Sequence, residues 1–403
     1  MTRTFNAAAR VLLGFGLAAT LFVPTAEAKK STFSVLYTFT GGDDGASPLA
    51  GLIADKQGNL YGTTWKGGAD DAGTVFELAP NGAESVLLTF DITNGYEPYL
   101  GNLTADKAGN FFGTTVKGGN DYGIVYELAP DGIETVLYKF TGGSDAGSPF
   151  YDLVQDKKGN LYGTTEDGGA NGDGTVFKVS PDGIETVLYS FCSQAGCTDG
   201  SMPWSQLIID KSGNLYGTTW LGGTTYSCGY EASGCGTLFK LAPDGTETVL
   251  HTFAGGATDG CYPLAGVIAD KSGTFYGTAE ECGTGGDGTV FKVAPDGTET
   301  ILHGFSGGSD GAWPWAALVE DSDGNLYGTT TIDGNSSANC YGGSCGTVFE
   351  IAPNGTETIL HTFTGGSDGG NSYAALRLKG AWLYGTAENG GADGYGTVFK
   401  VKK

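Results

Sequence analysis

Positive charge is scarce in this chain of 403 residues. Lysine and arginine together number 21 against 45 aspartates and glutamates, and the formal net charge is −24. A protein this acidic is repelled by phosphate backbones and by anionic lipid surfaces. We therefore expect no nucleic-acid partner.

Histidine and arginine, the usual cationic groups of catalytic sites, are scarcer still. The three histidines, His251, His303 and His361, all take the place of a tyrosine in a repeated strand. They are framework substitutions, so Ser–His and Cys–His chemistry lacks its base. Arg377 is the one arginine after residue 28, which excludes the arginine cluster of a sialidase.

Long apolar runs are absent except near the N-terminus. Arg3 and Arg10, the apolar run 11–23 and the small-residue site Ala26-Glu27-Ala28 predict a signal peptide over residues 1–28. The run is too short to span a bilayer comfortably, and no later segment is apolar enough to do so. We expect an exported protein, either secreted or periplasmic, with no membrane span and with one mature domain over residues 29–403.

Glycine, by contrast, is abundant, at 72 residues, and it punctuates an internal repeat. The motif Leu-Tyr-Gly-Thr-Thr recurs with its glycine at Gly62, Gly113, Gly163, Gly217, Gly277, Gly328 and Gly385. Each unit is expected to form four strands, which we name A to D, and turns such as Pro80-Asn81-Gly82 separate C from D. Four-stranded units of about 40 to 50 residues are typical of β-propeller blades.

The two ends of the chain indicate how the ring closes. Residues 32–39 form a lone strand D, whereas the last repeat stops after strand C, at Val401. We predict an all-β, seven-bladed propeller in which residues 32–39 complete the last blade and so cover an exposed sheet edge.

The pattern Leu-Tyr-Gly-Thr-Thr, Gly-Thr-Val-Phe and Phe-x-Gly-Gly-x-Asp-Gly resembles the GloVer tandem-repeat family, named for Gloeobacter and Verrucomicrobium. The resemblance covers residues 32–402. It implies a propeller-like exported bacterial protein, and it implies no activity and no catalytic residues. Members carry varied anchors after the repeats, and we expect none here.

One face of such a ring is expected to be variable. The A–B and C–D turns are short and uniform, whereas the B–C and D–A loops, which share the other face, are long, and loops on a rigid scaffold are where binding residues concentrate. All eight cysteines fall in these loops, and an even number in an exported chain predicts disulfides. The expected pairs are Cys192–Cys197, Cys228–Cys235, Cys261–Cys282 and Cys340–Cys345. Free buried thiols and a zinc site are the alternatives.

An Asp-Gly element precedes strand A in nearly every blade. The equivalent residues are Asp44, Asn94, Asp145, Asp199, Asp259, Asp310 and Asp368. Carboxylate oxygens in a ring suggest Ca²⁺, while a hydrogen-bonded turn is the alternative. Because the element is present throughout, we favour the turn and expect no cofactor. The same holds for residues 321–325, which resemble the start of a calcium loop.

Two groups of loop-face residues are candidates for function. Glu166, Glu280 and Glu388 directly follow strand B and would serve as a glycosidase acid–base pair, unless they are simply exposed acids. Aromatic residues gather in blades 4 and 6, and with Glu280 they suggest a sugar-stacking surface. These aromatic residues are Trp204, Trp220, Trp313, Trp315, Tyr226 and Tyr341. Packing between blades is the alternative for Trp204 and Trp315.

Three functions stay open at this point. The first hypothesis is a monomeric, non-catalytic binding module that takes a carbohydrate or a cell-surface partner through the loop face of blades 4 to 6. A carboxylate-based glycosidase or lyase is the second, and a structural envelope protein is the third. Propellers host all three, so the fold cannot decide among them.

Overall fold

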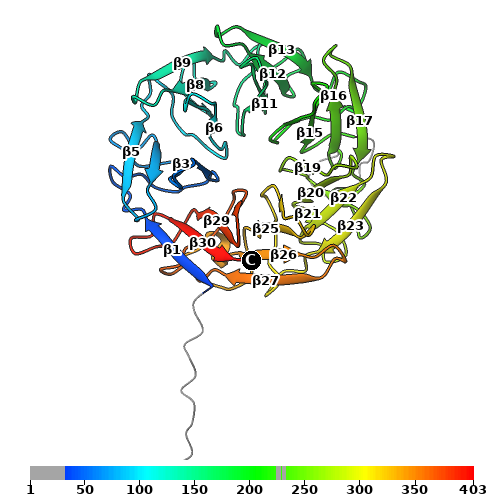
Figure 1. Ribbon diagram of the computed structural model, residues 1–403. Helices are drawn as coiled ribbons and strands as arrows, with labels where there is room; N and C mark the ends of the chain where they lie inside the picture. Colours follow the sequence, from blue (N-terminus) through cyan, green and yellow to red (C-terminus); the bar gives the residue numbers. More distant parts are fainter. Residues whose placement is uncertain (1–31, 224–227, 229–232) are drawn as a thin grey trace, which may run out of the picture. The chain divides into compact units, whose positions relative to one another are not determined.

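Seven antiparallel sheets of four strands each are arranged around a central axis (Figure 1). This computed structural model describes residues 32–223, 228 and 233–403, and Phe33–Lys403 form one unit. The prediction of an all-β, seven-bladed propeller is confirmed. The predicted signal peptide lies outside the described residues.

The blades follow one another along the chain, each with strands A to D in order. Blade 1 contains β2 (Ile53–Ala54), β3 (Leu60–Thr64), β4 (Thr74–Leu78) and β5 (Glu84–Thr89). Blade 2 contains β6 (Thr104–Ala105), β7 (Phe111–Thr115), β8 (Ile124–Leu128) and β9 (Glu134–Lys139). Blade 3 contains β10 (Val154–Gln155), β11 (Leu161–Thr165), β12 (Thr175–Val179) and β13 (Glu185–Ser190).

Blades 4 to 6 repeat this order. Blade 4 contains β14 (Ile208–Ile209), β15 (Leu215–Thr219), β16 (Thr237–Leu241) and β17 (Glu247–Thr252). Blade 5 contains β19 (Ile268–Ala269), β20 (Phe275–Ala279), β22 (Thr289–Val293) and β23 (Glu299–Gly304). Its loops add a small sheet of β18 (Gly260–Cys261) and β21 (Glu281–Cys282). Blade 6 contains β24 (Val319–Glu320), β25 (Leu326–Thr330), β26 (Thr347–Ile351) and β27 (Glu357–Thr362).

Both ends of the chain build blade 7. Its strands A to C are β28 (Arg377–Lys379), β29 (Trp382–Ala387) and β30 (Thr397–Lys402), and strand D is the N-terminal β1 (Phe33–Thr38). The pairing of β1 with β30 runs from Phe33 opposite Val401 to Thr38 opposite Thr397. In Figure 1 the blue strand lies beside the red one. The predicted closure is therefore confirmed.

The glycine of the repeated motif is explained by the core. In β3, Gly62 faces the Phe76 ring of the neighbouring strand, and a Cβ atom added there would lie 2.8 Å from the tip of that ring. Phe76 and Val75 are fully buried between blades. A side chain at the glycine would therefore push the blades apart.

Strand A is shorter than the sequence predicted. In blade 1 only Ile53–Ala54 pair, not residues 49–54. The preceding residues instead bond to the neighbouring blades; for example, the Gly51 amide donates to Asn102 Oδ1.

A threonine of strand B also joins one blade to the next. Its hydroxyl donates to a carbonyl of the next blade in six junctions. The pairs are Thr114 to Tyr151, Thr164 to Ser205, Thr218 to Ala265, Thr278 to Ala316, Thr329 to Ser372 and Thr386 to Ala50. The last of these bonds crosses the closure from blade 7 to blade 1.

One residue before each strand A has a left-handed backbone, with φ between 52° and 62°. These residues are Ser47, Glu97, Ser148, Met202, Tyr262, Trp313 and Asn371. In each case the backbone N–H donates to the B–C loop of the preceding blade, and the carbonyl accepts from the residue after strand B of its own blade, as Ser47 does with Tyr395 and Trp65. Because bonds on both sides hold the backbone, it keeps a conformation that non-glycine residues rarely adopt.

The single helix of the described chain is η1 (Tyr341–Gly343), a short 3-10 turn in the B–C loop of blade 6. Within the described residues, no helix is long and apolar enough to cross a bilayer.

Candidate functional site

The loop face carries all four disulfides. The structure joins Cys192 to Cys197, Cys228 to Cys235, Cys261 to Cys282 and Cys340 to Cys345, which confirms every predicted pair. No cysteine is free, so the alternatives of free thiols and a zinc site are wrong. Four disulfides fit a protein of an oxidising compartment outside the cytoplasm.

The aspartates of the D–A loops act as turn residues. The Asp44 carboxylate accepts hydrogen bonds from the Thr40 amide, the Thr40 hydroxyl and the Tyr37 hydroxyl. In blades 4 to 6 a histidine replaces this tyrosine, and His361 Nε2 lies 3.1 Å from Asp368. This is the geometry of the predicted turn, and the histidines are part of it.

Aromatic side chains form a continuous chain of ring contacts between blades 1 and 5. Its members, in order, are Trp65, Tyr99, Phe150, Trp204, Trp220 and Tyr262, with ring centroids 5.0 to 6.0 Å apart. Trp204 and Trp220 lie parallel at 5.0 Å, and Trp315 contacts Tyr373 at 5.2 Å in blades 6 and 7. Part of the surface of Trp204, Trp220 and Trp315 is therefore used for packing between blades.

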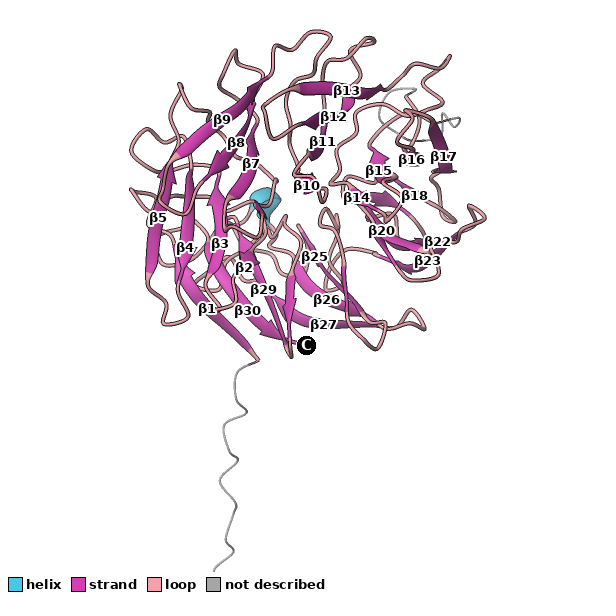
Figure 2. Cartoon of the chain, turned by 45° about the horizontal axis from the view of Figure 1, so that its top comes forward, coloured by secondary structure: helices cyan, strands magenta, loops and turns pink. Residues whose placement is uncertain are grey.

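The other predicted aromatic residues lie apart from this chain. Trp313 is half-buried at the left-handed position of blade 6. Tyr341 lies in η1, bracketed by Cys340 and Cys345, and its side chain is 64% exposed. Figure 2 shows η1 over the middle of the ring. Tyr226 lies outside the described residues.

Tyr341 brings the long loop of blade 6 to other blades. Its amide donates to Asn371 Oδ1 of blade 7 at 2.8 Å. Burial, with Glu388 nearby, raises the pKa of both Tyr99 and Tyr373, and Tyr341 contributes to both shifts. The loop therefore reaches residues of blades 2 and 7.

We call the chain of aromatic rings from Trp65 to Tyr262, together with Trp315, Tyr341 and three glutamates, the axial surface. The glutamates are Glu166, Glu280 and Glu388. Burial raises the pKa of Glu166 and of Glu280 to about 7, and burial also raises the pKa of Glu388. Asp167 raises the pKa of Glu166 further and Lys117 lowers it, while Glu281 raises the pKa of Glu280. Among the described residues no hydrogen bond joins the three carboxyl groups to one another. A glycosidase pair works at a separation of about 5 to 9.5 Å without contact, so the acid–base pair stays a prediction.

Several polar groups around the axis have no partner. Among the described residues, the buried indole N–H groups of Trp65, Trp204, Trp220 and Trp315 have no acceptor in hydrogen-bonding geometry, although those of Trp204 and Trp315 lie close enough to Glu166 and Glu280 to counter their pKa shifts. A cavity of about 20 Å³ beside Trp315, Tyr151 and Asp152 is large enough for one water molecule.

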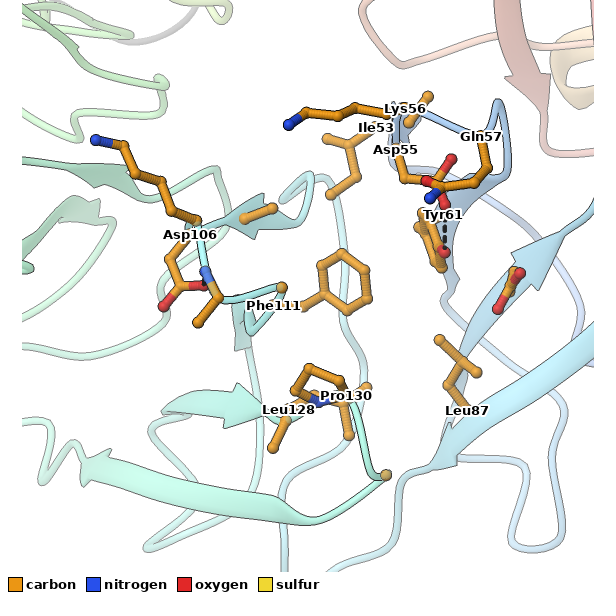
Figure 3. Close-up of a pocket in the computed structure, with 18 of the residues that line it drawn as sticks. Ile53, Asp55, Lys56, Gln57, Tyr61, Leu87, Asp106, Phe111, Leu128 and Pro130 are labelled. Carbon is orange, nitrogen blue, oxygen red and sulfur yellow. Dashed lines mark hydrogen bonds between the residues drawn. The ribbon is translucent and has the colours of Figure 1, made fainter.

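The opposite face also carries a cavity. A groove of about 1000 Å³ runs between blades 1 and 2 at the A–B and C–D turns (Figure 3). Tyr61, Phe111, Leu128 and Arg377 are among its lining residues. The sequence analysis missed this groove. The only signal was Arg377, the single arginine of the predicted mature chain.

The sequence matches a repeat-family model, the Gloeobacter/Verrucomicrobia repeat, over residues 18–230 and 221–403. The chain belongs to the Gloeobacter/Verrucomicrobia repeat family. No curated protein matches it in sequence.

Solved propellers share the fold of this Gloeobacter/Verrucomicrobia repeat protein at low identity. The extracellular domain of a putative one-component system, BT4673 from B. thetaiotaomicron, matches 92% of the chain at 11% identity with a TM-score of 0.56, and the match covers 40% of that chain. A puromycin hydrolase S511A mutant matches 87% of the chain and 52% of its own length at 12% identity, with a TM-score of 0.54.

A gluconolactonase from Xanthomonas campestris, XC5397, is 15% identical over 73% of the chain and 83% of its own, with a TM-score of 0.43. At 11% and 12% identity, the similarity to the first two structures shows the fold alone. The function of this repeat-family member has to be argued from its own residues.

Proposed function

We propose that this protein is a binding module that takes a carbohydrate on the axial surface. The observation that carries the proposal is the pair of buried indole N–H groups of Trp65 and Trp220, which have no acceptor among the described residues and lie among aromatic rings. Carboxyl groups of raised pKa complete the surface. An unpaired buried donor is costly, so this arrangement is incomplete without water or a ligand.

Hydroxyl-rich ligands suit these groups better than ions do. A sugar hydroxyl accepts from an indole N–H and donates to a carboxylate, and the apolar face of the sugar ring packs on an aromatic side chain. Carboxyl groups with pKa values near 7 are partly neutral at neutral pH, which lowers their attraction for cations. Exposed Tyr341 is the residue best placed to stack on a ligand that approaches from solvent.

Glycan-array screening of the exported protein tests this proposal. We expect binding to hydroxyl-rich glycans, and Tyr341→Ala should weaken it by about five- to tenfold, the loss of one aromatic contact. Tyr122→Ala is the matched control, because Tyr122 is 41% exposed in the B–C loop of blade 2 but packs against Gly142 and Gly147 of the next blade. Absence of any glycan ligand, or equal binding by both variants, would overturn the proposal.

A glycosidase is the second candidate, favoured by the raised pKa values of Glu166 and Glu280. A carboxyl group with a pKa near 7 is a competent general acid at neutral pH. Release of reducing ends from a bound glycan, abolished by Glu166→Gln or Glu280→Gln, would favour the enzyme. Binding without release would favour the module.

A further inference from the structure

The junction between blades 1 and 2 differs from the other six. The strand-B threonine of blade 1, Thr63, has a buried hydroxyl with no partner among the described residues, whereas its six equivalents donate to the next blade. The groove of about 1000 Å³ opens at this same junction. The two blades still touch, through Gly51 and Asn102 and through Tyr61 and Phe111.

The walls of the groove are largely aromatic and aliphatic. Tyr61 of β3 and Phe111 of β7 lie 4.7 Å apart at 43°. In Figure 3 the Phe111 ring faces the open space between Ile53 and Pro130, and Leu87 and Leu128 lie nearby. A cavity of this volume and lining accommodates a ring-sized organic molecule.

The guanidinium of Arg377 supplies an unused positive charge. It reaches the groove from β28 of blade 7, makes no ion pair within the described chain, and its buried Nε has no acceptor there. Burial lowers the pKa of Arg377, although an arginine stays protonated. A buried N–H of a guanidinium without an acceptor is costly unless a ligand or water satisfies it.

Most acidic groups of the groove are already engaged. Asp55 accepts bonds from the Gly58 and Asn59 amides and from the Tyr61 hydroxyl, and these bonds lower its pKa. Asp106 accepts from the Ala108 and Asn110 amides in the equivalent turn. Lys56 and Lys107, next to these aspartates, are exposed at the groove.

We infer that this groove is a binding site for a small organic carboxylate carried on a ring. The carboxylate pairs with Arg377, with Lys56 and Lys107 nearby, and the ring packs against Phe111 and Tyr61. Planar carboxylates suit the fork of donors on a guanidinium. The site lies on the face opposite the axial surface, so it is independent of the function proposed above.

Glu77 is the acidic residue of the groove whose charge should oppose an anionic ligand. It lines the groove beside Tyr61, and no hydrogen bond or ion pair engages its carboxylate within the described residues. A negative charge there opposes an anionic ligand, so its removal should tighten binding.

Calorimetric titration of the full chain with benzoate and with its neutral isostere benzamide tests the inference. We expect benzoate to bind several-fold more tightly than benzamide. Arg377→Gln should weaken benzoate by about tenfold and leave benzamide unchanged, since a charged hydrogen bond is lost. Glu77→Gln should strengthen benzoate by about twofold or more.

Two further variants locate the site. Ala105→Trp should abolish binding of both probes, because Ala105 is an exposed residue that lines the groove and an indole there fills it. Lys271→Gln changes the equivalent turn lysine of blade 5 and should have no effect. The inference is overturned by absence of benzoate binding at millimolar concentration, by equal affinity for the two probes, or by unchanged binding in Arg377→Gln and Ala105→Trp.

Discussion

Blade 7 is built from both ends of the chain, whereas each of the other six is continuous, and their junctions use different chemistry. In blades 1 to 6 strand D begins with a glutamate, namely Glu84, Glu134, Glu185, Glu247, Glu299 and Glu357. Blade 7 has Phe33 at this position, and its ring stacks on His361 at 3.6 Å.

The glutamates lie in carboxylate-rich surroundings. Glu84, for example, lies beside Asp44 and Tyr37 of the preceding blade, and Glu357 lies beside Asp310 and His303. One oxygen of each of the six glutamates is buried without a partner among the described residues. Chain continuity holds these six blades together whatever the protonation state, whereas the closing strand is held mainly by its packing and its pairing with β30. The comparison teaches that the blade without chain continuity has an aromatic ring at the position where the other six have a buried, titratable carboxyl group.

Removal of residues 32–39 should have the largest effect. It exposes the edge of β30 and strips Phe33, Tyr37 and Phe39 from the core, a loss on the order of 5–10 kcal/mol, which is comparable with the whole stability of a domain. We expect aggregation or a collapse of the melting temperature in calorimetry. A chain that begins at Thr32 is the control, and an unchanged melting temperature after the deletion would refute the role of the closing strand.

Reduction of any one disulfide should come next, and it should spare blade 7. The bridges lie in the loops of blades 4 to 6, and each contributes about 2–3 kcal/mol in the chain-entropy picture. Hydrogen exchange should quicken in these loops while β1 and β30 stay protected. Faster exchange of β1 and β30 after reduction would contradict the prediction that the closing blade does not depend on the disulfides.

Stability should fall as pH rises from about 5 to about 8.5. Burial raises the pKa of five of the glutamates from 4.5 to about 7, and that of Glu357 to about 8. The folded state therefore holds protons that the unfolded state releases, and this contribution, complete below about 4.5, is lost as pH passes the folded values. Calorimetry should show the melting temperature dropping by several degrees. Replacing the six glutamates with glutamine should make the melting temperature nearly independent of pH in this range. A melting temperature that rises with pH in the unmodified protein would contradict the prediction.

The most local effect is expected for Phe33→Glu, which gives blade 7 the residue of the other blades. It buries a carboxyl group beside His361 and Phe399 and should cost about 2–4 kcal/mol at pH 8.5. Protonation should recover part of this loss at pH 5. Thr32→Glu, exposed just before β1, is the control. A variant as stable as the parent at pH 8.5 would show that apolar packing is not needed at the closure.

The ring was predictable because its motif repeats in every blade, and the disulfides were predictable because the cysteines lie in pairs that are close in the sequence. The glycine of Leu-Tyr-Gly-Thr-Thr marks every strand B, and each pair of cysteines is separated by only 5 to 21 positions. The seventh blade followed from the lone strand at residues 32–39.

The groove and the contacts of the aromatic residues depend on packing between blades, which leaves no local signal in the sequence. Thr63 has the same residue type as its six equivalents, so nothing in the sequence marks the junction that opens into a groove. The sequence did not predict the contacts that the aromatic residues make across blade junctions, such as that of Phe150 in blade 3 with Trp204 in blade 4, because they depend on neighbouring blades meeting at the axis. Whether these residues bind a ligand stays a prediction.

The left-handed residue before each strand A has a consequence for how such proteins diversify. Its backbone amide and carbonyl make the same bonds in all seven blades whatever the side chain. Asn371 adds side-chain bonds to Thr331 and Ser344 of blade 6. Serine, glutamate, methionine, tyrosine, tryptophan and asparagine all occupy this position in one molecule. The side chain at each of the seven positions can therefore change independently, one blade at a time, while the backbone bonds and the architecture stay the same.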